Sequence, residues 1–115
     1  MGAFAAGQVV LLPFPFSDLS RSKFRPALLL ADAGRGDWIA CQITSNPFAD
    51  TRAGEITDAD FAVGGLQRLS YARPGKLLTA HQGLFAGNAG AVQTERLAAG
   101  RDAVVHLITG HGQSG

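Results

Sequence analysis

The sequence predicts a mainly β fold of the α+β type, a small, strongly bent barrel of short antiparallel strands followed by a C-terminal α-helix. Fifteen glycines and five prolines in 115 residues imply many turns, which favour short strands over long helices. Short apolar runs recur between these turns at regular spacing, as expected for a small barrel. Near the C-terminus, Leu97, Val104 and Ile108 fall near one helical face, with Arg101 between them.

The composition indicates one globular domain over residues 1–115, with a core between about residues 7 and 109 and a frayed tail after residue 110. The hydrophobic fraction of 46% excludes general disorder. The net charge of +1 does not by itself indicate a nucleic-acid binder, although a local basic patch would still attract RNA.

A single cysteine and the N-terminal pattern predict a cytoplasmic protein. Cys41 has no partner for an internal disulfide and lies in an apolar run, so it is interpreted as a buried structural residue. The apolar stretch from Ala3 to Phe16 has no basic start and is interrupted by prolines. It therefore matches neither a signal peptide nor a membrane span.

The first half of the chain predicts three strands. Gln8–Leu12 is an apolar strand that ends at a Pro-Phe-Pro-Phe break, and Ser17–Lys23 is a polar loop. Pro26–Ala31 and Asp37–Thr44 are two further strands, joined by a tight turn over Ala33–Gly36. Buried strands thus frame three cations of the loop and its end, Arg21, Lys23 and Arg25, an arrangement suited to binding an anion.

The second half predicts shorter elements. A polar loop over Asn46–Ala53 precedes a short strand at Glu55–Thr57 and one helical turn over Asp58–Val63, capped by Thr57 or Asp58. The remaining predicted elements are strands at Leu69–Tyr71 and Lys76–Thr79 on either side of Arg73-Pro74-Gly75, a closing strand at Ala91-Val92, and a helix that Thr94 caps and Gly110 ends after Thr109.

The hairpin formed by the second and third strands allows a prediction of register. If its turn is centred between Gly34 and Arg35, paired residue numbers sum to about 69, and partners share a face about 5 Å apart. A bulge would shift this sum. The predicted pairs are Leu30 with Ile39, Leu28 with Cys41, and Arg25 with Thr44, and Gln42 lies one diagonal step away on the same face.

Arg25 is the leading candidate for binding a phosphate. Its guanidinium is permanently charged and can donate two parallel hydrogen bonds to phosphate oxygens. Thr44 and Ser45 would add hydroxyl groups beside that cation. The simpler alternative is a solvated arginine at a strand start, with ordinary turn chemistry after the strand.

A second cationic cluster contains an aromatic residue, a combination that suits single-stranded RNA because charges follow the backbone while a ring stacks on a base. The alternative is a polar strand edge with protective charges. The cluster consists of Arg68, Ser70, Tyr71, Arg73 and Lys76.

The histidines do not indicate a metal site. His81, His106 and His111 lack metal-ligand spacing with one another or with the cysteine. Only His81, just after a predicted strand, is a candidate acid or base. The sequence contains no glycine-rich phosphate loop, so no cofactor and no metal are expected.

Taken in order, several motifs resemble the MazF/PemK-like toxins of bacterial toxin–antitoxin systems, from about Gly7 to Leu107. They are Gly7-x-Val9-Val10-Leu11-x-x-Phe14-Pro15-Phe16-Ser17-Asp18-Leu19-Ser20, Lys23-x-Arg25-Pro26-Ala27-Leu28, Ile43-Thr44-Ser45, Asp60-Phe61 with Gly65-Leu66, and Ser70-x-Ala72-Arg73-x-x-Lys76-Leu77-x-Thr79.

The resemblance implies an SH3-like barrel that works as a homodimer. It implies a metal-independent endoribonuclease that cuts single-stranded RNA at short sequences, and a cognate antitoxin whose disordered segment folds over the groove. By position, Arg25 and Thr44 match the catalytic arginine and threonine of the family. The general base is open between Asp18 and His81. The residues expected to bind RNA are Ser17, Lys23, Gln42, Ser45, Arg68, Ser70, Tyr71, Arg73 and Lys76.

In this reading the 2′-hydroxyl of the RNA attacks the adjacent phosphorus, and Arg25 stabilises the charge that develops on the phosphate oxygens. Two alternatives from other classes remain. CcdB-like toxins share the fold and poison DNA gyrase without cutting RNA, and a catalytically inactive relative would bind RNA without turnover.

Overall fold

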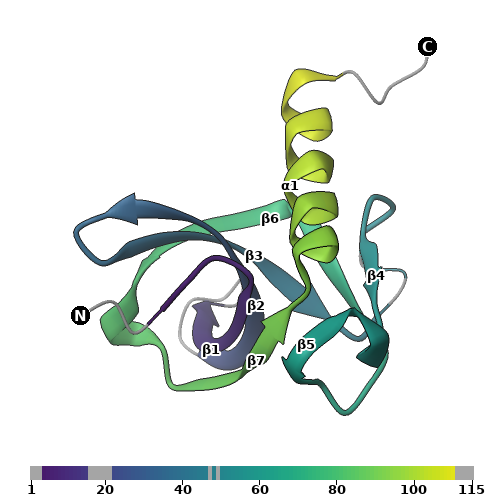
Figure 1. The fold of residues 1–115 in the computed structure, drawn as a ribbon. Coiled ribbons are helices and arrows are strands. Elements are labelled where there is room, and N and C mark those ends of the chain that lie inside the picture. The colour runs from purple at the N-terminus through teal and green to yellow at the C-terminus, as the bar shows by residue number, and fades with distance from the viewer. Residues whose placement is uncertain (1–3, 16–21, 47, 49, 111–115) are drawn as a thin grey trace.

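The computed structural model describes residues 4–15, 22–46, 48 and 50–110, and only the backbone of Pro15, Ser22 and Lys23. In this part of the chain, one antiparallel sheet has the strand order β4-β6-β3-β2-β1-β7-β5 and is followed by helix α1 (Figure 1). The predicted mainly β fold with a C-terminal helix is therefore confirmed. The strands are β1 (Gln8–Pro15), β2 (Ser22–Gly34), β3 (Asp37–Thr44), β4 (Gly54–Ile56), β5 (Phe61–Gly64), β6 (Ser70–His81) and β7 (Gly87–Val92), with short 3-10 helices η1 (Asp58–Asp60) and η2 (Gln82–Leu84), and α1 (Thr94–Thr109).

The sheet forms a half-barrel whose central strands bury side chains on both faces. Alternate residues of a strand point to opposite faces, and β1 to β3 bury residues of both alternations. One core cluster contains Val9, Leu28, Leu30, Cys41, Ile43, Ile56, Phe61, Ala72 and Val92. The other contains Val10, Leu12, Phe14, Ala27, Leu29, Trp38, Ala40 and Ala80.

Helix α1 covers the first of these clusters. Leu97 and Val104 pack against it, and Gly100 is buried so closely that an added Cβ would lie 3.3 Å from the Leu28 side chain. Arg101 anchors the helix by donating from Nε to the Leu30 carbonyl at 2.9 Å. Ile108 lies near the same helical face as Leu97 and Val104, as predicted, but its side chain is exposed because the end of the helix extends beyond the sheet (Figure 1).

The helix ends are capped almost as predicted. Gly110 ends α1 in the left-handed conformation, with φ of 75°. The N-cap is Gln93 and not Thr94, so the helix begins one residue earlier than predicted. In the described residues, no helix is both long and apolar enough to cross a membrane.

The first strand is longer than predicted, since β1 continues through the prolines to Pro15. Its neighbour β7 pairs only with Gln8–Leu11, whereas β2 pairs along β1 as far as Pro15. Among the described residues, no strand pairs with Pro13 on the β7 side of β1. A proline tolerates such an edge because it has no N–H to leave unsatisfied.

Two predictions for the second half were wrong. The two strands expected around Arg73-Pro74-Gly75 are one strand, β6, which accommodates these residues in a bulge: Cys41 pairs with Leu77 and Ile43 with Ala72. The helical turn expected over Asp58–Val63 ends at Asp60. Phe61–Gly64 pairs instead with β7 as β5, a contact between distant segments that local propensity does not encode.

The hairpin prediction holds in part. Leu28 pairs with Cys41 as predicted, but Ala31 and not Leu30 faces Ile39, because a bulge follows Leu29. The ladder between β2 and β3 ends at the pair Ala27 and Gln42, whose numbers still sum to 69. The bulge therefore does not disturb the register at the end of the hairpin that holds the candidate site.

Candidate functional site

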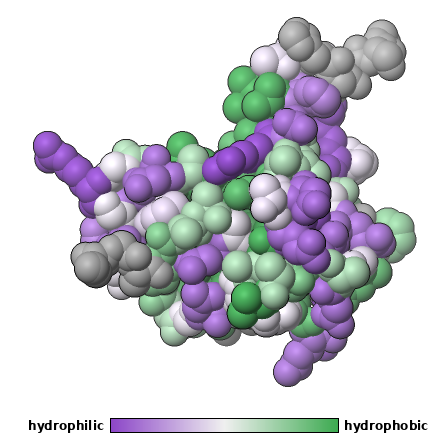
Figure 2. All heavy atoms as spheres, in the orientation of Figure 1, coloured by the Kyte–Doolittle hydropathy of each residue, from purple (hydrophilic) through white to green (hydrophobic). Residues whose placement is uncertain are grey.

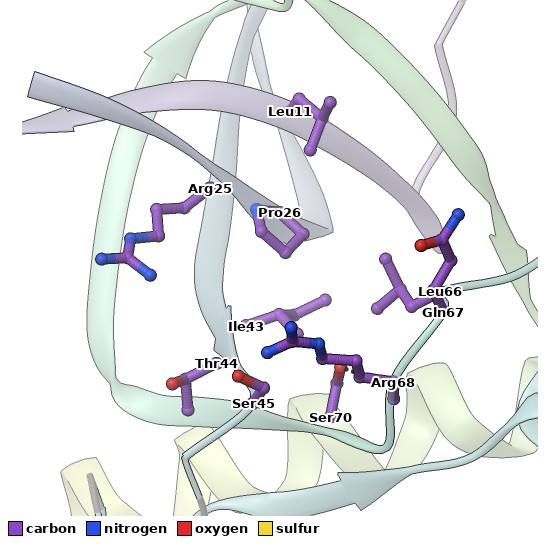
Figure 3. A pocket seen from close by; sticks show the side chains of 10 residues that line it. All are labelled: Leu11, Arg25, Pro26, Ile43, Thr44, Ser45, Leu66, Gln67, Arg68 and Ser70. Carbon is purple, nitrogen blue, oxygen red and sulfur yellow. Dashed lines mark hydrogen bonds between the residues drawn. The ribbon is translucent and has the colours of Figure 1, made fainter.

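A pocket of about 470 Å³ opens where β1, β2, β3 and the start of β6 meet (Figure 3). Apolar side chains form its wall, and two arginines and three hydroxyl-bearing residues lie around it. A concave, partly apolar site with a few convergent polar groups is the usual form of a binding pocket. It is lined by Leu11, Arg25, Pro26, Ile43, Thr44, Ser45, Leu66, Gln67, Arg68 and Ser70.

Arg25 is held on β2, opposite Leu12 of β1. Pro26 follows it and restricts its backbone to the extended region, which suits a strand. The Arg25 side chain is half-buried. Figure 3 shows Arg25 and Thr44 on the same side of the pocket. The structure thus brings together the two residues that the hairpin arithmetic paired.

Thr44 is the last residue of β3 and begins the turn that leads away from the sheet. Its Oγ1 accepts a hydrogen bond from the Asn46 N–H at 3.1 Å. A hydroxyl that accepts in this way keeps its own hydrogen for donation, for example to a phosphate oxygen. Ser45 is exposed beside it and adds a second hydroxyl to the pocket.

Arg68 comes from the opposite wall, in the segment between β5 and β6. Its guanidinium extends across the pocket toward Ser45 and Ile43 (Figure 3). The backbone of Arg68 is tied to the sheet, because the buried Ser70 donates from Oγ to the Arg68 carbonyl at 2.9 Å. Ser70 therefore positions Arg68 as well as lining the pocket. Two permanent cations at one pocket favour an anion between them.

The other predicted RNA-binding residues of β3 and β6 do not line the pocket. Tyr71 pairs with Thr44 in the ladder. Gln42 accepts a hydrogen bond at 3.2 Å from Nη1 of Arg73, which also forms an ion pair with Asp50 at 3.6 Å. Lys76 is exposed in the bulge of β6. Arg73 is thus engaged in holding the loop after β3.

The structure places His81 far from the pocket, contrary to a role as its acid or base. His81 pairs with Asp37 at the first residue of β3, whereas Thr44 is the last. At about 3.3 Å per residue, the two ends of this strand lie roughly 23 Å apart. The His81 Nδ1 accepts from the Gly83 N–H at 3.0 Å and so begins η2.

Other predicted residues of the first loop lie outside the part that the structure describes. These are Ser17, Asp18 and Arg21, and for Lys23 the structure gives only the backbone. Sequence reasoning missed the apolar wall and Gln67. Leu66 was quoted only as part of a motif, although a Gly-Gly-Leu-Gln-Arg run between two strands is a signal for an exposed loop that carries function.

Cys41 is a buried core residue that does not line the pocket. Burial raises the pKa of the Cys41 thiol to about 11, an effect that the nearby Arg96 partly opposes. Cys41 is thus a protonated core residue, in agreement with its interpretation from sequence. Within the described ranges, no group of three or more His, Cys, Asp or Glu side chains could hold a metal ion.

No protein-family model matches the sequence, and no curated protein is detectably similar to it. Several solved structures are similar to this chain. The MazE-MazF complex from Deinococcus radiodurans has 20% identity and a TM-score of 0.72, over 99% of this chain and 100% of that one. This chain has the MazF fold. The toxin MazF-mt6 from Mycobacterium tuberculosis gives 17% identity and a TM-score of 0.67, over 89% and 96%.

A mycobacterial endoribonuclease in complex with its cognate antitoxin also has the MazF fold, with 16% identity and a TM-score of 0.65 over 96% of both chains. The likeness therefore spans the sheet and the helix together. At this level of identity it establishes the fold, and the chemistry must be argued from the pocket.

Proposed function

We propose that this protein is a MazF-like endoribonuclease toxin that cuts single-stranded RNA at specific sequences without a metal. The observation that carries the proposal is the convergence of Arg25, Thr44 and Arg68 on one pocket of a chain with the MazF fold. Two guanidiniums and a hydroxyl are the groups that a phosphodiester requires, because all three donate hydrogen bonds to oxygen.

In the proposed reaction, the 2′-hydroxyl of a ribose loses its proton and its oxygen bonds to the adjacent phosphorus. The bond from phosphorus to the 5′-oxygen breaks, and that oxygen takes up a proton. The products are a 2′,3′-cyclic phosphate and a 5′-hydroxyl. Arg25 and Arg68 stabilise the negative charge that grows on the phosphate oxygens, while Thr44 orients the group.

The mechanism also needs a base that accepts the proton of the 2′-hydroxyl. Arginine stays protonated and is a poor base, and none of the described residues that line the pocket is a carboxylate or a histidine. With His81 at the other end of β3, we assign the role to Asp18 of the first loop. An Asp18→Asn variant should retain RNA affinity and lose turnover.

The test is cleavage of single-stranded RNA by the purified protein in EDTA. Arg25→Ala should slow cleavage about 100- to 1,000-fold, the usual cost of one donor to a developing oxyanion. Arg35→Ala is a matched control because this exposed arginine lies in the turn between β2 and β3. Equal activity of the Arg25 variant would remove Arg25 from the mechanism.

Other outcomes of the same experiment separate the alternatives. RNA binding without turnover would indicate an inactive relative, and inhibition of gyrase without RNA cleavage would indicate a CcdB-like poison. A strand with a 2′-deoxyribose at the cut site should not be cleaved, because it lacks the nucleophile. Cleavage of that strand would exclude the proposed chemistry.

The proposal includes a homodimer and a cognate antitoxin in the cytoplasm. Val105 and Ile108, 53% and 72% exposed, form an apolar face at the end of α1 that a second copy would cover. In Figure 2, hydrophobic atoms gather near this end of the helix. We infer that a disordered antitoxin segment folds over the basic pocket. An antitoxin partner is supported by the similar MazF structures from Deinococcus radiodurans, which were solved as MazE-MazF complexes. Sedimentation at several protein concentrations tests the dimer.

A further inference from the structure

A second cavity lies directly beside the pocket that contains Arg25, Thr44 and Arg68, which we call the phosphate pocket. It measures about 220 Å³ and shares Leu66, Gln67 and Arg68 with that pocket. Pockets for drug-sized ligands measure about 300–1,000 Å³, so this side cavity suits a smaller, flat group. Its lining consists of Thr57, Asp58, Leu66, Gln67, Arg68 and Leu69.

The lining combines apolar surfaces with a polar edge. Leu66 is half-buried and Leu69 is exposed, so both can pack against the faces of a planar ring. Gln67 offers an amide, with one acceptor and two donated hydrogens. Asp58 offers a carboxylate, which accepts at both of its oxygens. This is the lining expected of a site that holds one nucleobase by its faces and reads its edge.

Asp58 stands on a fixed turn. It is the first residue of η1, where Thr57 and Asp60 form a capping box: the Thr57 N–H donates to Oδ2 of Asp60 at 2.7 Å. The Asp58 carboxylate lies against the loop that leads to Arg68, because a Cβ added to Gly65 would come within 3.3 Å of its Oδ1. A glycine at that position therefore leaves room beside the carboxylate.

We propose that the side cavity is a guanine-selective subsite, and that Asp58 determines its specificity. The Watson–Crick edge of guanine presents two adjacent donors, N1–H and the 2-amino group, which match the two carboxylate oxygens in parallel hydrogen bonds. Cytosine and adenine present one amino group next to an acceptor, and uracil presents one N–H between two carbonyls. None of these three edges offers two adjacent donors.

This inference rests on the proposed RNA cleavage and extends it. Arg68 lines both cavities, so its cation would contact the phosphate while the neighbouring base enters the side cavity. The selected guanine is then one of the two nucleotides that flank the cut bond. Specificity arises from a base contact, whereas Arg25 and Arg68 contact the backbone that all sequences share.

The test measures base selection by binding as well as by cleavage. The probes are strands of 2′-deoxyuridine, which have no 2′-hydroxyl and therefore cannot be cut by the proposed reaction. Each probe carries one central guanine, hypoxanthine or adenine. Hypoxanthine differs from guanine only in lacking the 2-amino group. Fluorescence anisotropy should show guanine preferred over hypoxanthine by about 5- to 150-fold, the range for one good bidentate base contact. Cut sites on a long RNA should carry guanine at one flanking position.

Asp58→Asn should abolish this preference, because an amide has only one acceptor oxygen. Glu55→Gln is the matched control, since it changes the charge equally at an exposed residue of β4 that does not line the cavity. Leu69→Ala should weaken binding of every strand and keep the preference, since Leu69 contacts the face of the base and not its edge. Circular dichroism confirms that each variant is folded.

Two results would overturn the inference: equal affinity of the wild-type protein for guanine and hypoxanthine, or an unchanged preference in Asp58→Asn. The same experiments distinguish a failure of the guanine subsite from a failure of the proposed RNA cleavage. A protein that binds guanine strands selectively but cuts no RNA keeps the subsite and loses the nuclease. One that cuts RNA without guanine at a flanking position keeps the nuclease and loses the subsite.

Discussion

Replacing Gly64 with alanine tests how the phosphate pocket is supported. Gly64 ends β5 and faces Gly90 of β7, and its φ is +72°. A Cβ at this position would collide with the Ala89 carbonyl and would lie 2.8 Å from the Gly90 Cα. Both obstacles are backbone atoms, which cannot rotate away. The pairing of β5 with β7 therefore requires glycine here.

The expected loss of stability has two parts. A left-handed backbone costs a residue with a Cβ about 1–2 kcal/mol, and overpacking costs about 1–3 kcal/mol more. Gly64→Ala should therefore lower the free energy of unfolding by about 2–5 kcal/mol. Gly110→Ala is a matched control, because its φ is +75° and, among the described residues outside its own helix backbone and its chain neighbours, no heavy atom lies within 4 Å of an added Cβ. Gly110→Ala should therefore lower the free energy of unfolding by only about 1–2 kcal/mol, the cost of the left-handed backbone.

Urea unfolding at one fixed protein concentration measures both variants, since a dimer makes stability depend on concentration. RNA affinity is the second readout. The segment from Gly65 to Arg68 continues directly from β5 into the pocket wall, so a folded Gly64→Ala protein should also bind RNA more weakly. Equal destabilisation by the two substitutions would refute the close approach of β5 and β7 as the reason for glycine.

Three further substitutions, at His81, Arg68 and Cys41, also have expected outcomes. His81→Ala should cleave RNA at the wild-type rate, because the residue lies at the far end of β3 from Thr44; a loss as large as that of Arg25→Ala would contradict this placement. Arg68→Gln should weaken binding and make the salt slope of RNA affinity shallower by about 0.7, the value for one phosphate contact on a single strand, and an unchanged slope would exclude the contact. Burial raises the Cys41 pKa from 9.0 to about 11, so between these pH values the folded state keeps a proton that the unfolded chain has lost. Stability should therefore fall as the pH rises through this window, and thermal unfolding should show a smaller fall for Cys41→Ala.

The positions of Arg25 and Thr44 could be predicted because they depend on a local hairpin. The turn over Ala33–Gly36 joins two neighbouring strands, so counting outward from it places distant side chains. Even here the sequence did not place the bulge after Leu29. The spacing of apolar residues likewise predicted the strand pattern and the C-terminal helix.

The other half of the pocket depends on contacts between segments far apart in the chain. Phe61–Gly64 is a strand only because β7, some 25 residues later, pairs with it. That pairing carries Leu66, Gln67 and Arg68 to the wall opposite Arg25, and no local pattern in the sequence encodes it. The sequence by itself thus determined the fold class and the placement of Arg25 and Thr44, the proposed catalytic pair, at one end of a hairpin. Only the tertiary structure decided that a second arginine and a base-sized cavity with Asp58 would complete the site.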